Sequence, residues 1–206
     1  MERTGDGGDV AVYDSGSTSL RYSSYQNLGN LQKRLVGANN VEQSATELTP
    51  AGGENVEVKF VTPIAANPFD QNRLLIGGNN GVFETIDGGL TVSGPLAEGS
   101  VNDMVAGGRR LGVRYANVAY AATTDGVFFR GTTGQNFEGT NYPGLGATAV
   151  TVDSEDWEHA FALDSNGHVF ATRNHGESWS DITGNLSRDI GSHSWRTLEF
   201  IPGNEG

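Results

Sequence analysis

The sequence Gly81-Val82-Phe83-Glu84-Thr85 is followed by two related strings further along the chain. The related strings are Gly126-Val127-Phe128-Phe129-Arg130 and Gly167-His168-Val169-Phe170-Ala171-Thr172, and their first glycines are separated by 45 and 41 residues. Each string follows a short apolar run and a polar turn of the Asn-Gly or Asp-Gly type, which tolerates positive φ. The sequence therefore predicts three β-hairpins that are spaced by one repeating unit.

The stretches around these hairpins complete the repeat. Alternation of apolar and polar residues predicts one more strand before each hairpin, at 56–61, 101–106 and 147–153. The amino-terminal part fits the same scheme, and a further strand begins near the carboxyl end, so that strands are also expected at 9–14, 19–25, 31–35 and 195–201. No stretch carries a 3.6-residue period, so we expect essentially no helix.

A unit of about 45 residues with three or four antiparallel strands is typical of a β-propeller blade. We therefore expect an all-β fold in which residues 1–206 form one partial propeller domain, belonging to a larger propeller of about six to eight blades. The blades are expected at 8–50, 54–96, 97–143 and 145–190, with the start of the next blade at 194–202. Closure within the chain, or pairing with a second copy, is the alternative.

Composition narrows the classes of partner. The 206 residues include 30 glycines, no cysteine and a net charge of −12. Such an acidic chain disfavours nucleic acids and anionic membranes, because phosphate binding needs clusters of Lys and Arg. The one dense basic spot, Arg109-Arg110 with Arg114, is interpreted as a solvated loop. The absence of cysteine leaves no disulfide or thiolate chemistry, and no apolar run is long enough to cross a bilayer.

Two segments that follow the third strand of their blades share a pattern. They are Thr85-Ile86-Asp87-Gly88-Gly89-Leu90-Thr91-Val92 and Thr172-Arg173-Asn174-His175-Gly176-Glu177-Ser178-Trp179. Both resemble the Asp-box, or bacterial neuraminidase repeat, whose pattern is Ser/Thr-x-Asp-x-Gly-x-Thr/Ser-Trp. The first has Val92 in place of tryptophan, and the second has Asn174 in place of aspartate. Segment 130–137 keeps only the glycine and the aromatic end of the pattern.

The chemistry of these residue types suggests a structural role. A short polar side chain caps turn amides, glycine permits positive φ, and a hydroxyl bonds back across the hairpin. We therefore expect hairpin stabilisation from Thr85, Asp87, Gly89, Thr91, Asn174, Gly176, Ser178 and Trp179. The resemblance, which extends to sialidase-like, xyloglucanase-like and sortilin-like propellers, implies that the boxes lie at the periphery and away from the ligand.

The resemblance invites a search for glycosidase chemistry. Sialidases carry an Arg-Ile-Pro motif, which is missing from this sequence, so that activity is disfavoured. Propeller glycosidases of the xyloglucanase type use two carboxylates, one to protonate the leaving oxygen and one to activate water or attack. Asp6 and Asp9 are the candidates, because glycines surround them just before an innermost strand. The acidic run 153–156 is interpreted as a solvated turn.

The sequence offers few candidates for metal, cofactor or ligand sites. Asp6, Asp9 and Asp14 have oxygen ligands suited to calcium, but their spacing does not match a calcium loop. The four histidines show no zinc-site spacing, so we expect neither a metal nor a cofactor. Tyr22, Tyr25 and Trp195 are candidates for a sugar-stacking platform, with burial between blades as the competing interpretation.

Nothing in the sequence assembles a complete reacting constellation. We therefore favour a non-catalytic binding or scaffold module of an extracellular bacterial protein, whose partner is a carbohydrate or another protein. The alternative is a fragment of a carbohydrate-active glycoside hydrolase whose second carboxylate lies elsewhere. We also expect a mature fragment without a signal peptide, and self-association through open blade edges. A third possibility is an intracellular assembly factor similar to the Asp-box propeller that helps build photosystem II. Such a factor would need a basic patch, which this chain of net charge −12 does not show.

Overall fold

The computed structural model describes residues 6–186 and 196–202. This part of the chain contains sixteen β-strands and two short 3₁₀ helices, η1 (Gln26–Leu28) and η2 (Gly53–Asn55). The strands form four antiparallel sheets of four strands each, which confirms the all-β prediction. None of the helices among these residues is long and apolar enough to span a membrane.

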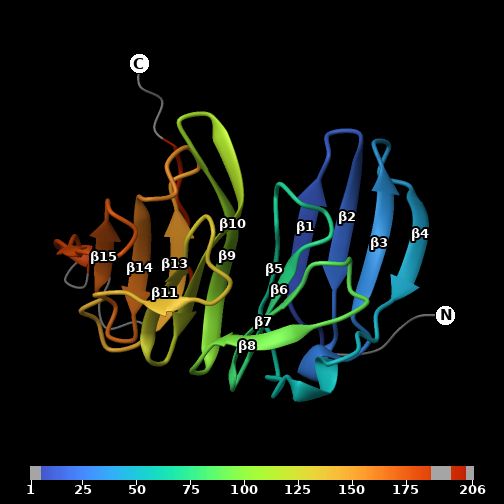
Figure 1. Cartoon of the computed structure of the whole chain (residues 1–206), viewed down its shortest axis with the longest axis horizontal. Helices are drawn as coiled ribbons and strands as arrows, with labels where there is room; N and C mark the ends of the chain where they lie inside the picture. Colours follow the sequence, from blue (N-terminus) through green and yellow to red (C-terminus); the bar gives the residue numbers. More distant parts are fainter. Residues whose placement is uncertain (1–5, 187–195, 203–206) are drawn as a thin grey trace. The chain divides into compact units, whose positions relative to one another are not determined.

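The chain divides into two compact units, residues 1–98 and 99–206, and each contains two sheets (Figure 1). In the first unit, the strands of the first sheet follow one another in chain order as β1 (Val10–Asp14), β2 (Thr18–Ser23), β3 (Gln32–Gly37) and β4 (Glu42–Glu47). The second sheet has the same order, with β5 (Ile64–Ala66), β6 (Leu74–Gly78), β7 (Gly81–Thr85) and β8 (Ser93–Ala97).

The second unit repeats this topology. Its third sheet consists of β9 (Val101–Arg110), β10 (Val113–Thr123), β11 (Gly126–Arg130) and β12 (Glu138–Gly139). Its fourth sheet consists of β13 (Ala147–Val152), β14 (Ala160–Asp164), β15 (Val169–Thr172) and β16 (Ser180–Asp181). In each unit the first strands of the two sheets lie next to each other, β1 beside β5 and β9 beside β13.

The glycines of the recurring strings are required by the hairpin turns. Gly81 and Gly126 have φ angles of +129° and +128°, which L side chains rarely adopt. A Cβ atom at Gly81 would also collide with the carbonyl of Ala97 on the neighbouring strand β8. The repeat that the sequence displays is therefore a repeat of backbone conformation.

Two expected strands are not formed. Residues 56–61 are a loop, and the first strand of the second sheet begins only at Ile64. Residues 196–202 have no regular secondary structure, although Leu198 packs on the apolar cluster that contains Leu163 of β14. In this described part of the segment the expectation of a strand at 195–201 was wrong, and Trp195 lies outside the described residues.

Each unit has a core between its two sheets. In the first unit, Ala11 and Tyr22 of the first sheet pack with Ile64, Ile76 and Phe83 of the second. Alternation along β1 leaves Val10 and Val12 on the opposite face, where they are 68% and 55% exposed. One face of the first sheet is thus buried inside the unit and the other is open.

The core of the second unit also consists of apolar side chains from its two sheets. Val118, Tyr120 and Ala122 alternate along β10 and pack against Val150 and Ala162 of the fourth sheet. All five side chains are at most 2% exposed. Apolar burial of this kind is the main source of stability in such a unit.

A carboxylate joins the two sheets of each unit. Asp9 accepts hydrogen bonds from the amide of Val10 at 2.8 Å and from the amide of Ile64 on β5 at 2.9 Å. Asp103 repeats this arrangement, accepting from Met104 at 2.8 Å and from Val150 on β13 at 3.0 Å. One oxygen serves the carboxylate's own strand and the other serves the next sheet, an arrangement that we call the carboxylate clamp.

A tyrosine makes a second connection in each unit. The hydroxyl of Tyr22 donates to the carbonyl of Gln71 at 3.3 Å, and that of Tyr120 donates to the carbonyl of Trp157 at 2.8 Å. Both acceptors lie in the loop between the first two strands of the following sheet. The two units therefore share a carboxylate clamp at one position and a tyrosine bond at another.

The clamp gives a stability prediction. Replacing Asp103 by alanine removes a charged acceptor from two backbone amides, so we expect the free energy of unfolding to fall by about 2–3 kcal/mol. Urea denaturation followed by tryptophan fluorescence measures the change, because Trp157 and Trp179 both lie in this unit. The control is Glu138→Ala at an exposed position of β12, where a change within about 0.5 kcal/mol is expected. Equal stabilities for the two variants would contradict the role of the clamp.

Candidate functional site

The end of the first sheet where β1 begins gathers residues from three segments. These segments are 6–9 before β1, 24–30 between β2 and β3, and 57–62 before β5. Figure 1 shows η1, within the second segment, at this end of the sheet. We call this group of residues the β1 rim.

Residues 6–9 are held against the loop after β2. The amide of Asp6 donates to the Gln26 side-chain oxygen at 3.0 Å. A Cβ atom at Gly8 would lie 2.5 Å from the Ser24 hydroxyl and 2.7 Å from the carbonyl oxygen of Tyr25. Glycine is therefore needed at position 8 for the backbone to come this close.

The loop at 57–62 is also fixed in place. The Thr62 hydroxyl, which is fully buried, accepts from the Lys59 amide at 3.0 Å and donates to the Lys59 carbonyl at 2.9 Å. The amide of Asn27 donates to the carbonyl of Phe60 at 3.0 Å, and that of Asn79 donates to the carbonyl of Glu57 at 2.7 Å. These bonds close the chain on itself and explain why the alternating residues form no strand.

This fixed loop presents apolar side chains to solvent. Phe60 is 60% exposed and Val61 is 51% exposed, while Asp6, Asn27 and Glu57 are exposed polar neighbours on the same rim. Burial lowers the pKa of Lys59, the one lysine of the rim. Phe60 was not predicted as a site residue, because its alternation with polar residues indicated the buried face of a strand.

The two carboxylates predicted at this site differ in their surroundings. Asp6 is exposed. Both oxygens of Asp9 accept backbone amides in the carboxylate clamp, which gives Asp9 a structural task that its sequence context did not reveal. The rim thus offers one solvent-facing carboxylate of the predicted pair, and Asp6 and Asp9 as catalytic residues stay a prediction.

The predicted sugar platform is only partly formed. Tyr22 is 2% exposed, and burial, with a smaller effect of the Asp70 charge, raises its pKa to about 12. It is a core residue, as the competing interpretation of burial between blades expects, and its role in ligand binding stays a prediction. Tyr25 lies half-buried in the rim, and Trp195 lies outside the described residues. Phe60, which the sequence did not single out, is the largely exposed aromatic side chain among the described residues of the rim.

The first Asp-box forms a closed hydrogen-bond network. The Thr85 hydroxyl donates to Asp87 Oδ1 at 2.9 Å and accepts from the amide of Gly89 at 2.9 Å. Asp87 Oδ1 also accepts from the amides of Leu90 and Thr91, and Asp87 Oδ2 accepts from the Thr91 hydroxyl at 2.7 Å. These bonds, those from Thr91 foremost, hold the pKa of Asp87 well below its usual range.

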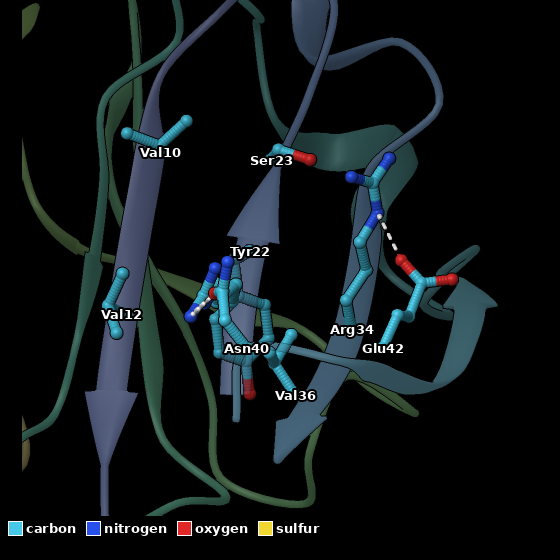
Figure 2. A pocket seen from close by; sticks show the side chains of 9 residues that line it. Val10, Val12, Tyr22, Ser23, Arg34, Val36, Asn40 and Glu42 are labelled. Atoms are coloured by element: carbon cyan, nitrogen blue, oxygen red, sulfur yellow. Dashed lines mark hydrogen bonds and ion pairs between the residues drawn. The ribbon is translucent and has the colours of Figure 1, made fainter. Parts of the chain in front are cut away.

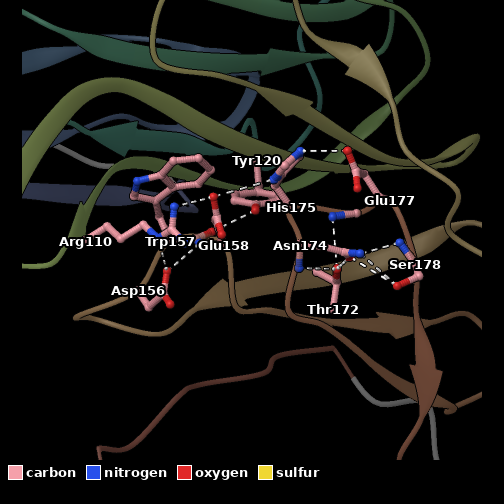
Figure 3. A network of polar contacts seen from close by, with 11 residues as sticks. Arg110, Tyr120, Asp156, Trp157, Glu158, Thr172, Asn174, His175, Glu177 and Ser178 are labelled. Carbon is pink, nitrogen blue, oxygen red and sulfur yellow. Dashed lines mark hydrogen bonds and ion pairs between the residues drawn. The ribbon is translucent and has the colours of Figure 1, made fainter.

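The second box has the same geometry with an amide in place of the carboxylate. Thr172 donates to Asn174 Oδ1 at 2.9 Å and accepts from the amide of Gly176 at 2.9 Å. The amide of Ser178 donates to Asn174 Oδ1 at 3.0 Å, and Asn174 Nδ2 donates to the Ser178 hydroxyl at 3.0 Å. Gly89 and Gly176 share a φ of +97°. Figure 3 shows this network beside the residues around Trp157.

Both boxes contact the preceding sheet of their unit. In the first, the Lys33 ammonium donates to the carbonyl of Gly88 at 2.7 Å, and a Cβ at Gly89 would lie 2.7 Å from the Leu48 side chain. In the second, the amide of Asn141 donates to the carbonyl of Gly176 at 2.9 Å. Trp179 is half-buried against the core of its unit, with its ring 5.2 Å from that of Tyr142.

The basic spot and the acidic run meet in the second unit. The arginines were wrongly expected to lie in a solvated loop, whereas the acidic run lies in an exposed turn, as predicted. Arg109 and Arg110 belong to β9, whose hairpin with β10 is longer than expected. Arg110 Nη1 bonds to Glu158, and its Nε lies 3.3 Å from Asp156 (Figure 3). Arg109 pairs with Glu155 at 3.2 Å. These ion pairs attach the hairpin to the loop before β14.

The open face of the first sheet carries a hollow of about 390 Å³. Figure 2 shows Val10, Val12 and Val36 lining it, with the Arg34–Glu42 ion pair at its side. Two exposed valines on a sheet face favour contact with another apolar surface. Self-association through open blade edges stays a prediction.

Metal ligands do not gather in the part of the chain that the structure describes. No group of three or more His, Asp or Glu side chains there has the geometry to hold an ion. The chemistry available at the β1 rim is therefore apolar contact through Phe60 together with hydrogen bonding by carboxylate and amide groups.

The fold resembles that of glycoside hydrolases of known structure. An ancestral GH74 enzyme matches with a TM-score of 0.64 and 19% identity, over 89% of this chain and 25% of its own. The GH74 xyloglucanase from Xanthomonas campestris matches with a TM-score of 0.61 and 16% identity, over 88% of this chain and 31% of its own. The four sheets match a portion of the GH74 β-propeller. No family model and no curated protein matches the sequence.

The first box gives a pH prediction. Because the folded protein holds the pKa of Asp87 below its ordinary value of about 3.9, the carboxylate stabilises the fold above that pH and loses this effect as pH falls further. Asp87→Asn keeps an acceptor, as Asn174 does, but does not titrate. We expect wild type to be the more stable at pH 7 and the difference to shrink below about pH 4.

Urea denaturation at pH 7 and at pH 3 measures this difference. The matched change is Asn174→Asp, which introduces the carboxylate into the second box and should add the same acid dependence to the second unit. A difference between wild type and Asp87→Asn that stays constant over this range would contradict the contribution of the charge.

Proposed function

We propose that this chain is part of the β-propeller of a carbohydrate-active glycoside hydrolase and contributes a polysaccharide-binding surface to it. The observation that carries the proposal is the likeness to two GH74 enzymes over 89% and 88% of the chain. One of these is a xyloglucanase by its name. The chain spans 25% and 31% of their lengths, so an activity of the whole protein draws on more than these four sheets.

Binding without hydrolysis is the function that the carboxylates support for this chain by itself. Glycoside hydrolysis requires two carboxylates that flank the scissile bond. In the clamp, both oxygens of Asp9 are occupied by backbone amides, and Asp6 is the exposed carboxylate at that end of the sheet. A polysaccharide substrate also favours an extracellular location for the protein.

The proposal is tested with the purified chain and xyloglucan. Affinity gel electrophoresis should show retardation by xyloglucan in the gel, and a reducing-sugar assay should show no release of product. Migration that is unchanged by xyloglucan, cellulose and mannan would overturn the binding function. Release of reducing sugar that Asp6→Asn or Asp9→Asn abolishes would show instead that the chain holds a complete catalytic pair.

A further inference from the structure

We propose that Phe60 is the stacking platform of a subsite for an uncharged sugar ring, with the exposed polar side chains of the β1 rim as its hydrogen-bonding groups. This inference rests on the proposed function and adds to it the residue that makes contact and the class of sugar. Three properties support it: the exposure of Phe60, the rigidity of its loop and the charge of its surroundings.

Phe60 is largely exposed to solvent. Phe60 leaves 60% of its surface in water, although a ring of this size normally contributes to a core. Its neighbour in sequence, Val61, is 51% exposed, so two successive residues of the loop present apolar side chains to solvent. An aromatic face of this kind matches the apolar C–H face of a pyranose ring.

The loop that carries Phe60 is held in place by hydrogen bonds. A mobile loop would lose conformational entropy on binding, and this loss weakens affinity. The Phe60 backbone is held by the amide of Asn27, and the loop around it is closed by Thr62 and tied by Asn79. The ring is therefore displayed on a backbone that is ordered before any ligand arrives.

Exposed polar side chains accompany Phe60 on the β1 rim. Asn27 is exposed and joined to Phe60 through its backbone, and its side-chain amide can both donate to and accept from sugar hydroxyls. Asp6 and Glu57 are exposed carboxylates of the same rim, which accept hydroxyl donors. An apolar platform with a few polar groups at its border is the usual composition of a ligand site.

Charge selects the class of sugar. Asp6, Asp9 and Glu57 are acidic, and Lys59 is the one basic side chain of the rim. The whole chain carries a net charge of −12. A uronic acid would bring another carboxylate into this field, and juxtaposed like charges oppose binding. Neutral sugars, such as the glucose and xylose units of a xyloglucan, meet no such penalty.

The experiment is isothermal titration of the whole chain with a neutral xyloglucan oligosaccharide and, separately, with an oligogalacturonate. We expect binding of the neutral ligand only. Phe60→Ala should weaken that binding by at least about tenfold, and Phe60→Trp should retain it. The control is Ile86→Ala, since Ile86 is 64% exposed and lies in the first Asp-box of the same unit, and it should bind like wild type.

The outcomes separate the two proposals. If wild type binds the neutral ligand and Phe60→Ala binds equally well, the platform is wrong while the proposed function stands. If wild type binds neither ligand, the proposed function fails and the subsite fails with it. Equal binding of oligogalacturonate would overturn the selection by charge. Circular dichroism and thermal unfolding of each variant exclude a loss of fold as the cause, because an exposed side chain contributes little to stability.

Discussion

A carboxylate that bonds to two neighbouring strands is the constraint on which each unit of this protein depends. Apolar contact between two sheets is non-directional and by itself fixes their relative register only weakly. Asp9 and Asp103 supply the missing direction, since one oxygen holds the carboxylate's own strand and the other holds an amide of the next sheet. The apolar core then packs in a fixed register around that bond.

The sheets of a unit play different parts in this arrangement. The first and third sheets supply the carboxylate and the tyrosine hydroxyl, whereas the second and fourth supply the backbone partners and the Asp-boxes. Position 63, which corresponds to Asp9, is proline, and position 149, which corresponds to Asp103, is alanine. The structure therefore repeats in pairs of sheets, although the most visible repeat of the sequence is the single hairpin.

The sequence predicted best what short-range chemistry determines. The hairpin glycines and the Asp-box turns are set by residues within a few positions of one another, so their spacing in the chain was sufficient. The features that were missed depend on distant partners. Arg110 bonds to Glu158, 48 positions later in the chain, and Asp9 bonds to the amide of Ile64, 55 positions later. The amide of Asn27 holds Phe60 in a loop that resembled a strand. Phe60 became a candidate only when that loop was seen.

The clamp also lets the connections between sheets differ in length. The connection from β4 to β5 covers residues 48–63, whereas the corresponding one from β12 to β13 covers only 140–146, yet both lead into a strand held in the same way. Since lengthening a loop adds only slowly to the entropy cost of closing it, such connections can accept insertions while the sheets keep their register. Residues could therefore be inserted at exposed positions of the connection between β4 and β5 while Val56 and Thr62 keep their buried places, much as variable loops are exchanged on a constant antibody framework.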